Sequence, residues 1–234
     1  MSDKINLNNN KTDILTSVAK SAVGAVPFAG ALLSELVGNV IPDQRFDRLT
    51  KYIEELDKKI SDISEEKINN LKDNDEFIDL IEEGFVQASR AITDERRRYI
   101  SSIVTNGITN DSIKLQESKF LLKLLQELND IEIIWLRFYL FPTFGGDEEF
   151  RNKHENILDR IQPYLGADKE IIQKAALQYS YIQHLERLGL IKNNIRFDKD
   201  LGQPLFNQFT GQPEISYSEI TQLGKLLLEQ ISLI

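Results

Sequence analysis

The chain has 234 residues, a hydrophobic share of 41% and a formal net charge of -9 at pH 7. This composition is that of a globular protein, and its acidic balance argues against a protein whose main role is to coat nucleic-acid phosphates. The absence of cysteine excludes disulfide frameworks, thiolate nucleophiles and cysteine-based metal sites and favours a reducing compartment, so we expect the cytoplasm.

The N-terminal part combines a polar start with a long apolar segment. Residues 1–12 are rich in asparagine and predict a flexible lead-in without the features of a secretory signal. Residues 21–42 carry a single charge, Glu35, and predict two helices, or one kinked helix, around Pro27. On a helical wheel this segment has an apolar stripe beside a groove of small residues; the membrane or oligomer positions are Phe28, Gly30, Leu32, Ser34, Leu36, Gly38 and Val40.

Three interpretations of this segment stay open. A continuous helix of its 22 residues would span about 33 Å, near the thickness of a bilayer core. Glu35 would cost about 2.5–3.5 kcal/mol near the middle of a membrane, and Pro27 splits the run, so a permanent anchor is the poorest interpretation. The others are the central helix of a soluble bundle and a sheltered segment that inserts and oligomerises when it is released.

The next stretch has an apolar seam. Its members recur at alternating spacings of three and four: Phe46, Leu49, Ile53, Leu56, Ile60 and Ile63. This spacing predicts an antiparallel helix pair or a modest dimer seam. The seam ends because Lys67 and Asn70 occupy the next core positions.

Further helices are predicted over residues 75–92, 94–107, 112–128 and 130–141. Asn129 and Glu132 have the spacing of a capping box at the start of the last of these. The sequence breaks between Phe141-Pro142 and Gly145-Gly146. We therefore place a helical bundle at residues 13–143 and a second domain at 144–234.

The second domain combines helices with a turn-rich stretch. A polar helix is expected around 148–161, and Asp168 should cap a helix that reaches Ile191. Four turn formers then separate short apolar pieces before a final helix: Gly202, Pro204, Gly211 and Pro213. A helix, a hairpin and a helix in this order resemble the winged-helix domains of bacterial regulators. The predicted fold class is mainly α, an N-terminal helical bundle followed by a winged-helix-like α+β module with a small β-hairpin.

Charge bears on what the winged-helix-like module binds. Residues 168–234 hold seven basic and eight acidic side chains, so DNA binding is disfavoured and protein contact is the better expectation. Four arginines form the one concentrated basic patch: Arg90, Arg96, Arg97 and Arg98. They predict either a solvated face paired with Asp94 and Glu95 or a site for an anion or an acidic partner.

No sequence motif for catalysis or for nucleotide binding is present. His154 and His184 are expected at the surface or the rim of the fold, because neither has a second motif partner nearby. We predict no catalytic residue, no cofactor, no metal site and no small-molecule substrate.

The N-terminal half carries three motifs in order: a glycine- and alanine-rich apolar start, the joint IPDQRFDRL, and ASRAITDERRRYI. This order resembles the bacterial abortive-infection proteins of the Abi-alpha type. The resemblance implies a bacterial origin and a role in phage defence, in which the infected cell is halted or killed. It brings no catalytic residues with it.

Two functions are therefore expected. The first is a non-enzymatic phage-defence effector or accessory protein, cytoplasmic at rest, whose apolar segment acts on the membrane after release. The alternative is a soluble regulatory adaptor that binds a protein, or less favourably DNA, through its tail and forms a homo-oligomer through the seam. An enzyme built from scattered carboxylates is a third, minor hypothesis.

Overall fold

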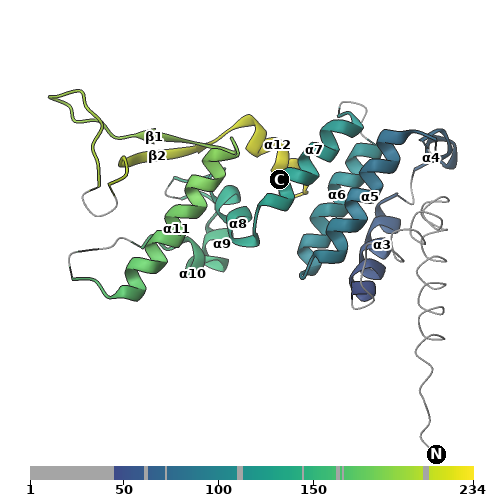
Figure 1. Ribbon diagram of the computed structural model, residues 1–234, viewed down its shortest axis with the longest axis horizontal. Coiled ribbons are helices and arrows are strands. Elements are labelled where there is room, and N and C mark those ends of the chain that lie inside the picture. The colour runs from purple at the N-terminus through teal and green to yellow at the C-terminus, as the bar shows by residue number, and fades with distance from the viewer. Residues whose placement is uncertain are drawn as a thin grey trace, which may run out of the picture. The chain divides into compact units, whose positions relative to one another are not determined.

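The computed structural model describes residues 45–60, 63–71, 73–109, 113–143, 145–161, 164, 166–207 and 211–234. In these ranges the chain is mainly helical with a small two-stranded antiparallel sheet near its C-terminus (Figure 1). The predicted fold class, a helical bundle followed by a small α+β module, is confirmed. The chain divides into two compact units: one runs up to Gln126 and includes Gln230–Ser232, and the other holds Glu127–Glu229 and the last two residues.

The first unit is a bundle of helices. Its elements are α3 (Phe46–Ile60), α4 (Glu65–Leu71), α5 (Asp75–Arg90), α6 (Asp94–Thr109) and α7 (Leu115–Glu127). Lys51 lies 3.9 Å from Asp94, and Lys59 donates to Ser102 Oγ at 2.6 Å, so α3 and α6 run in the same direction. Helix α5, between them in the sequence, runs the opposite way, as its three-residue connection to α6 requires.

The predicted seam lies inside this bundle. Helix α3 packs against α5 and α6, and the seam side chains that face them are at most 2% exposed: Leu49, Ile53, Leu56 and Ile60. Phe46 begins the helix, and Ile63 is half-buried just after it. A dimer through this seam would require the bundle to open, because the same side chains already pack within one chain.

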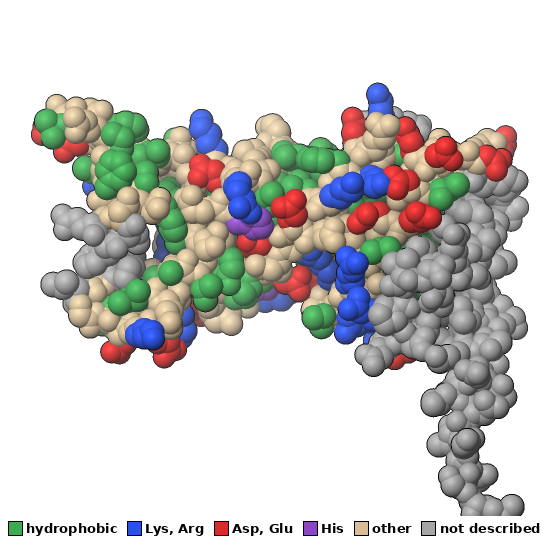
Figure 2. All heavy atoms as spheres, in the orientation of Figure 1, with side chains coloured by type: hydrophobic (Ala, Val, Ile, Leu, Met, Phe, Trp, Pro, Cys, Tyr) green, Lys and Arg blue, Asp and Glu red, His purple; other side chains and the backbone are tan. Residues whose placement is uncertain are grey.

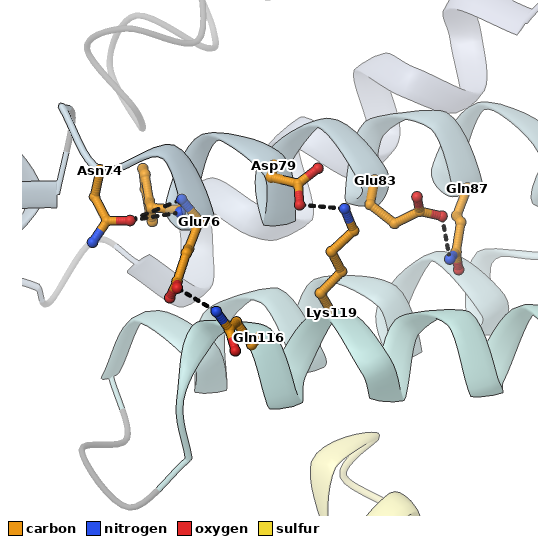
Figure 3. A network of polar contacts seen from close by, with 8 residues as sticks. Asn74, Glu76, Asp79, Glu83, Gln87, Gln116 and Lys119 are labelled. Carbon is orange, nitrogen blue, oxygen red and sulfur yellow. Dashed lines mark hydrogen bonds and ion pairs between the residues drawn. The ribbon is translucent and has the colours of Figure 1, made fainter.

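Polar side chains fix how α5 and α7 lie side by side (Figure 3). Glu76 on α5 accepts a hydrogen bond from Gln116 on α7, and Asp79 pairs with Lys119 one turn further along both helices. The buried Gln87 donates to the backbone oxygen of Leu122 at 2.9 Å. These contacts advance together along both helices, so α5 and α7 are parallel.

Two predictions for the first unit are wrong. The helix expected to close at Asn106-Gly107 continues to Thr109, because Gly107 serves close packing there: a Cβ at this position would lie 2.7 Å from Ser118 Oγ. Ile92 was expected on the apolar side of its helix, but it is 80% exposed. The reason is that α5 ends at Arg90 and the backbone turns to an extended conformation at Ala91.

The second unit starts within the part of the sequence assigned to the first domain. Its elements are α8 (Asp130–Phe138), α9 (Glu148–Lys153), α10 (Glu155–Leu158), α11 (Lys169–Arg187), β1 (Ile191–Ile195), β2 (Ile215–Ile220) and α12 (Gln222–Gln230). Helix α8 packs against α10 and α11. The units therefore divide between Gln126 and Glu127, whereas the sequence suggested a boundary at residues 143/144.

Two arginines connect the segments on either side of the break at residues 141–146. Arg137 on α8 pairs with Asp147 at 2.6 Å. Arg151 on α9 donates to the backbone oxygens of Phe141 and Thr143 at 2.7 and 2.6 Å. The break is thus a turn held inside the second unit.

The predicted hairpin is present, and the helices around it are shorter than expected. Helix α11 ends at Arg187, four residues before the predicted end, because Gly189 takes φ +72° and turns the chain into β1. Strands β1 and β2 are antiparallel, with Ile191 opposite Ile220. The helix expected over 148–161 is two short helices divided at His154, and the Asp168 side chain makes no capping hydrogen bond to α11.

Candidate functional site

A polar groove of about 660 Å³ lies between α11 and the start of α8, inside the second unit. It is open to solvent and is lined by Asn129, Glu132, Ser180, Tyr181, Gln183, His184, Glu186 and Arg187. Six of these residues come from α11, where the spacing of Ser180, His184 and Arg187 places them on one side of the helix. The volume falls in the range of small-molecule sites.

A carboxylate and an imidazole meet in the wall of the groove. Glu132 Oε1 lies 2.6 Å from His184 Nδ1, and the glutamate is only 3% exposed. Its second oxygen accepts a hydrogen bond from the backbone nitrogen of Asn129 at 2.8 Å, while the Asn129 side chain caps the Glu132 backbone nitrogen at 2.9 Å. The predicted capping box is therefore confirmed, and it also fixes the carboxylate that orients His184.

The pairing of Glu132 with His184 was not predicted from the sequence. The two residues are 52 positions apart, and Glu132 was assigned only to the cap of its helix. No local spacing rule connects residues on two helices that meet only in the folded unit, so this contact left no readable signal.

A second polar chain ties the hairpin to α11. Glu186 Oε1 accepts from the backbone nitrogen of Asn193 at 3.0 Å, and Glu186 Oε2 accepts from the Asn193 side chain at 2.7 Å. Asn193 in turn accepts from Ser218 Oγ on β2 at 2.6 Å. These hydrogen bonds anchor both strands to the end of α11. Burial and the Glu186 carboxylate also raise the pKa of the neighbouring Tyr179, so its phenol stays protonated.

The hairpin exposes large apolar side chains. We call this set the wing surface; each member is at least 41% exposed: Ile195, Phe197, Leu201, Phe206 and Tyr217. Figure 2 shows hydrophobic side chains gathered over the hairpin, which Figure 1 labels β1 and β2. Beyond β1, isolated antiparallel β-bridges join Phe197 to Pro204 and Phe206 to Pro213.

The basic patch divides into two kinds of residue. Arg97 is 5% exposed, donates to the backbone oxygen of Ala91 at 2.7 Å and pairs with Asp94. Arg96 is half-buried and donates to the backbone oxygen of Leu125. Both bind carbonyls at the C-terminal ends of helices, where a positive charge is stabilising. Arg90 and Arg98 are exposed, so the four arginines do not form one anion site.

The apolar N-terminal segment, Phe28, Gly30, Leu32, Ser34, Leu36, Gly38 and Val40, and the lead-in at residues 1–12 lie outside the described residues. None of the helices that the structure does describe is long and apolar enough to cross a membrane. Among the same residues, no three histidine, aspartate or glutamate side chains gather as metal ligands would.

The groove contains a serine, a histidine and a carboxylate. A catalytic serine needs its base within hydrogen-bond reach, and in this part of the structure no hydrogen bond joins Ser180 to His184. The wing surface and the groove are two features of the described residues that could contact another molecule. No protein-family model matches the chain, no curated protein matches its sequence, and no solved structure matches it.

Proposed function

We propose that this chain is a non-enzymatic adaptor that binds a protein partner through the wing surface. The observation that carries the proposal is the exposure of five large apolar side chains on one hairpin, with Phe197 at 53%, Phe206 at 56% and Leu201 at 72%. Concentrated exposed apolar side chains mark interaction sites, and aromatic residues contribute most of the energy in such interfaces.

Side-chain docking suits this hairpin better than the addition of a strand. Pro204 and Pro213 stand opposite Phe197 and Phe206 at the far part of the hairpin. Proline lacks the backbone N–H that a new strand would need and interrupts pairing at an edge. A partner would therefore bind the aromatic side chains in pockets of its own surface.

The hairpin is also held ready for binding. The hydrogen bonds from Asn193 to both oxygens of Glu186, and from Ser218 to Asn193, attach its two strands to α11. A surface that is ordered before binding loses less conformational entropy on association. This rigidity supports recognition of a folded protein.

The charge of the hairpin favours protein over DNA. Residues 191–220 contain three basic side chains (192, 196 and 199) and four acidic ones (198, 200, 214 and 219). Arg196 lies 3.4 Å from Glu214, so one of the three positive charges is partly neutralised. Binding to a phosphate backbone requires an excess of positive charge.

Replacement of both wing phenylalanines tests the proposal. We expect Phe197→Ser with Phe206→Ser to remove a specific protein that co-purifies with the wild-type chain from its native host and binds it again after purification. Phe120→Ser is the matched control, because Phe120 is 54% exposed on α7. A partner that binds the double variant as tightly as the wild type would contradict the proposal.

The second candidate is a phage-defence effector that acts on the membrane. It is supported by the 22 residues from position 21 to 42 with one charge and by the resemblance to abortive-infection proteins. We propose that this segment is sheltered in a cytoplasmic chain until a cue releases it. The chain and a version without residues 1–42 would be compared in flotation and dye leakage with anionic liposomes. Flotation that survives the deletion, or no flotation at all, would contradict this candidate.

Gly30→Leu with Gly38→Leu tests the mechanism of that candidate. Leucine at both positions fills the small-residue groove and should prevent close helix pairing. We expect the double variant to lose toxicity in cells and membrane association. Unchanged toxicity and association would show that close packing of this segment is not how it acts.

A further inference from the structure

We infer that the groove between α11 and α8 binds an oxyanion, the phosphate or carboxylate group of a small molecule, between Arg187 and Nε2 of His184. This inference is independent of the adaptor function, since the groove and the wing surface consist of different residues. It rests on which polar atoms of the groove already have a hydrogen-bond partner within the protein and which do not.

Both carboxylates that line the groove are occupied. Glu132 accepts from His184 and from the Asn129 backbone, one partner at each oxygen. Glu186 accepts two hydrogen bonds from Asn193, also one at each oxygen. Every carboxylate oxygen in the groove therefore already has a donor, and neither carboxylate is open to a cation as its main partner.

The atoms that remain are chiefly donors. Arg187 is exposed, and its guanidinium has no hydrogen-bond or ion-pair partner among the described residues. In the same part of the chain, the Asn129 side-chain amide nitrogen and the Ser180 and Tyr181 hydroxyls also have none. A guanidinium with amide and hydroxyl donors is the typical recognition set for phosphate and carboxylate.

The Glu132 carboxylate prepares His184 for the same task. A histidine whose Nδ1 donates to a carboxylate keeps its ring orientation. The opposite nitrogen, Nε2, donates an N–H to an anion when the ring is protonated. His184 and Arg187 are three residues apart on α11, so both can reach one group from the same side of the helix.

The experiment follows the two histidines of the chain by NMR in protein labelled with ¹³C-histidine. His154→Gln assigns the two signals. Inorganic phosphate is titrated at about pH 6, below the ordinary histidine pKa of about 6.5, while sodium chloride keeps the ionic strength constant. We expect a saturable shift of the His184 signal with an affinity on the order of millimolar and no saturable shift of the His154 signal.

Two variants on α11 separate a specific site from general charge attraction. Arg187→Gln should weaken phosphate binding about tenfold, the effect of one charge-assisted contact. Lys174→Gln is the control, because Lys174 is an exposed cation on the same helix that pairs with Glu170. It should leave the affinity unchanged. Circular dichroism would verify that both variants fold.

Each outcome decides the inference. Saturation by phosphate or by acetate, lost in Arg187→Gln and kept in Lys174→Gln, supports it, and the tighter anion identifies the preferred group. A His184 signal that moves for neither anion overturns it. So does a shift that grows without saturation, or one that the two variants weaken equally, because the anion would then be attracted only by net charge.

Discussion

Tyr52 shows how closely three helices of the first unit pack. Its ring is fully buried and meets Phe85 edge-on at 5.8 Å between ring centres. Its hydroxyl has no hydrogen-bond partner among the described residues, and a Cβ at Gly84 would lie only 2.7 Å from it. Burial strongly raises the pKa of Tyr52, so the phenol is neutral at any ordinary pH.

Removal of this buried hydroxyl should not lower the free energy of unfolding. Tyr52→Phe removes a desolvated polar group that has no partner and leaves the ring contacts in place. We expect the free energy of unfolding in urea to stay unchanged or to rise by up to about 1 kcal/mol. A loss of more than about 1 kcal/mol would mean that the hydroxyl is hydrogen-bonded in the folded protein.

Arg97 and Arg98 are adjacent in the sequence and differ in role. Arg97 is buried and binds the end of α5 at Ala91, whereas Arg98 is exposed. We expect Arg97→Gln to lower the free energy of unfolding by about 1.5–3 kcal/mol, since hydrogen bonds of a charged group are lost. Arg98→Gln should change it by less than about 0.5 kcal/mol. Equal effects of the two substitutions in urea unfolding would refute this distinction.

The effect of Arg97→Gln on the free energy of unfolding should depend on pH. The hydrogen bond from Arg97 and the charge of Lys51 hold the pKa of Asp94 below its ordinary value. The unfolded chain therefore binds more protons in the window between the two pKa values, and stability is lost as the pH falls through it. The stability difference between wild type and Arg97→Gln should shrink below about pH 4. A difference that grows on acidification would contradict this sign.

At the scale of elements, Gly224 decides how α12 meets the hairpin. A Cβ at this position would overlap the backbone oxygen of Leu190 and lie 2.8 Å from Ile220 Cγ1. We expect Gly224→Ala to destabilise the second unit by at least about 2 kcal/mol and to increase amide exchange in β1 and β2. Gln222→Ala, at an exposed position of α12, is the control. Unchanged exchange in Gly224→Ala would show that this contact is not close.

The periodicity and the caps predicted the positions of the helices better than they predicted the helix ends. The 3.5-residue spacing of the seam identified the buried side of α3, and Asn129 with Glu132 marked the start of α8. Asn106-Gly107 was misread as a helix end because a glycine selected for close packing has the same sequence appearance as a C-cap. The outcome depends on the neighbour, Ser118, which no local pattern reveals.

At the scale of the whole molecule, the chain returns to the first unit at its end. Residues 230–232 belong to that unit: Asn106 donates to the backbone oxygen of Gln230 at 3.2 Å, and Ser232 Oγ lies 3.2 Å from Ser102 Oγ. Ile231 between them is 2% exposed. A C-terminal residue thus contributes to a bundle formed more than a hundred positions earlier.

Ile231→Ala tests whether the end of the chain stabilises the first unit. Loss of a buried isoleucine side chain costs about 2–4 kcal/mol, and the loss should appear as faster amide exchange in α6, which belongs to the first unit. Ile234→Ala is the matched control, because Ile234 is 51% exposed. Exchange in α6 that is equal in the two variants would show that the chain end does not stabilise the bundle.

The limits of sequence reasoning at this scale have one cause. The predicted boundary at residues 143/144 followed a true break in periodicity, but Arg137 and Arg151 hold that break within the second unit. Likewise, Glu132 and His184 are each ordinary residues of their own helices. Hairpin, helices and fold class depend on local patterns and could be predicted; pairings between distant elements depend on packing and could not.

The central claim, that the wing surface binds a protein, is tested most directly by a photo-reactive benzoylphenylalanine at position 197 in cells of the native host. The matched control carries it at position 120, an equally exposed phenylalanine on α7. The account predicts a discrete covalent adduct with one protein from position 197, lost when Phe206→Ser is added, and none from position 120. Adducts that are absent from position 197, or identical from both positions, would contradict it.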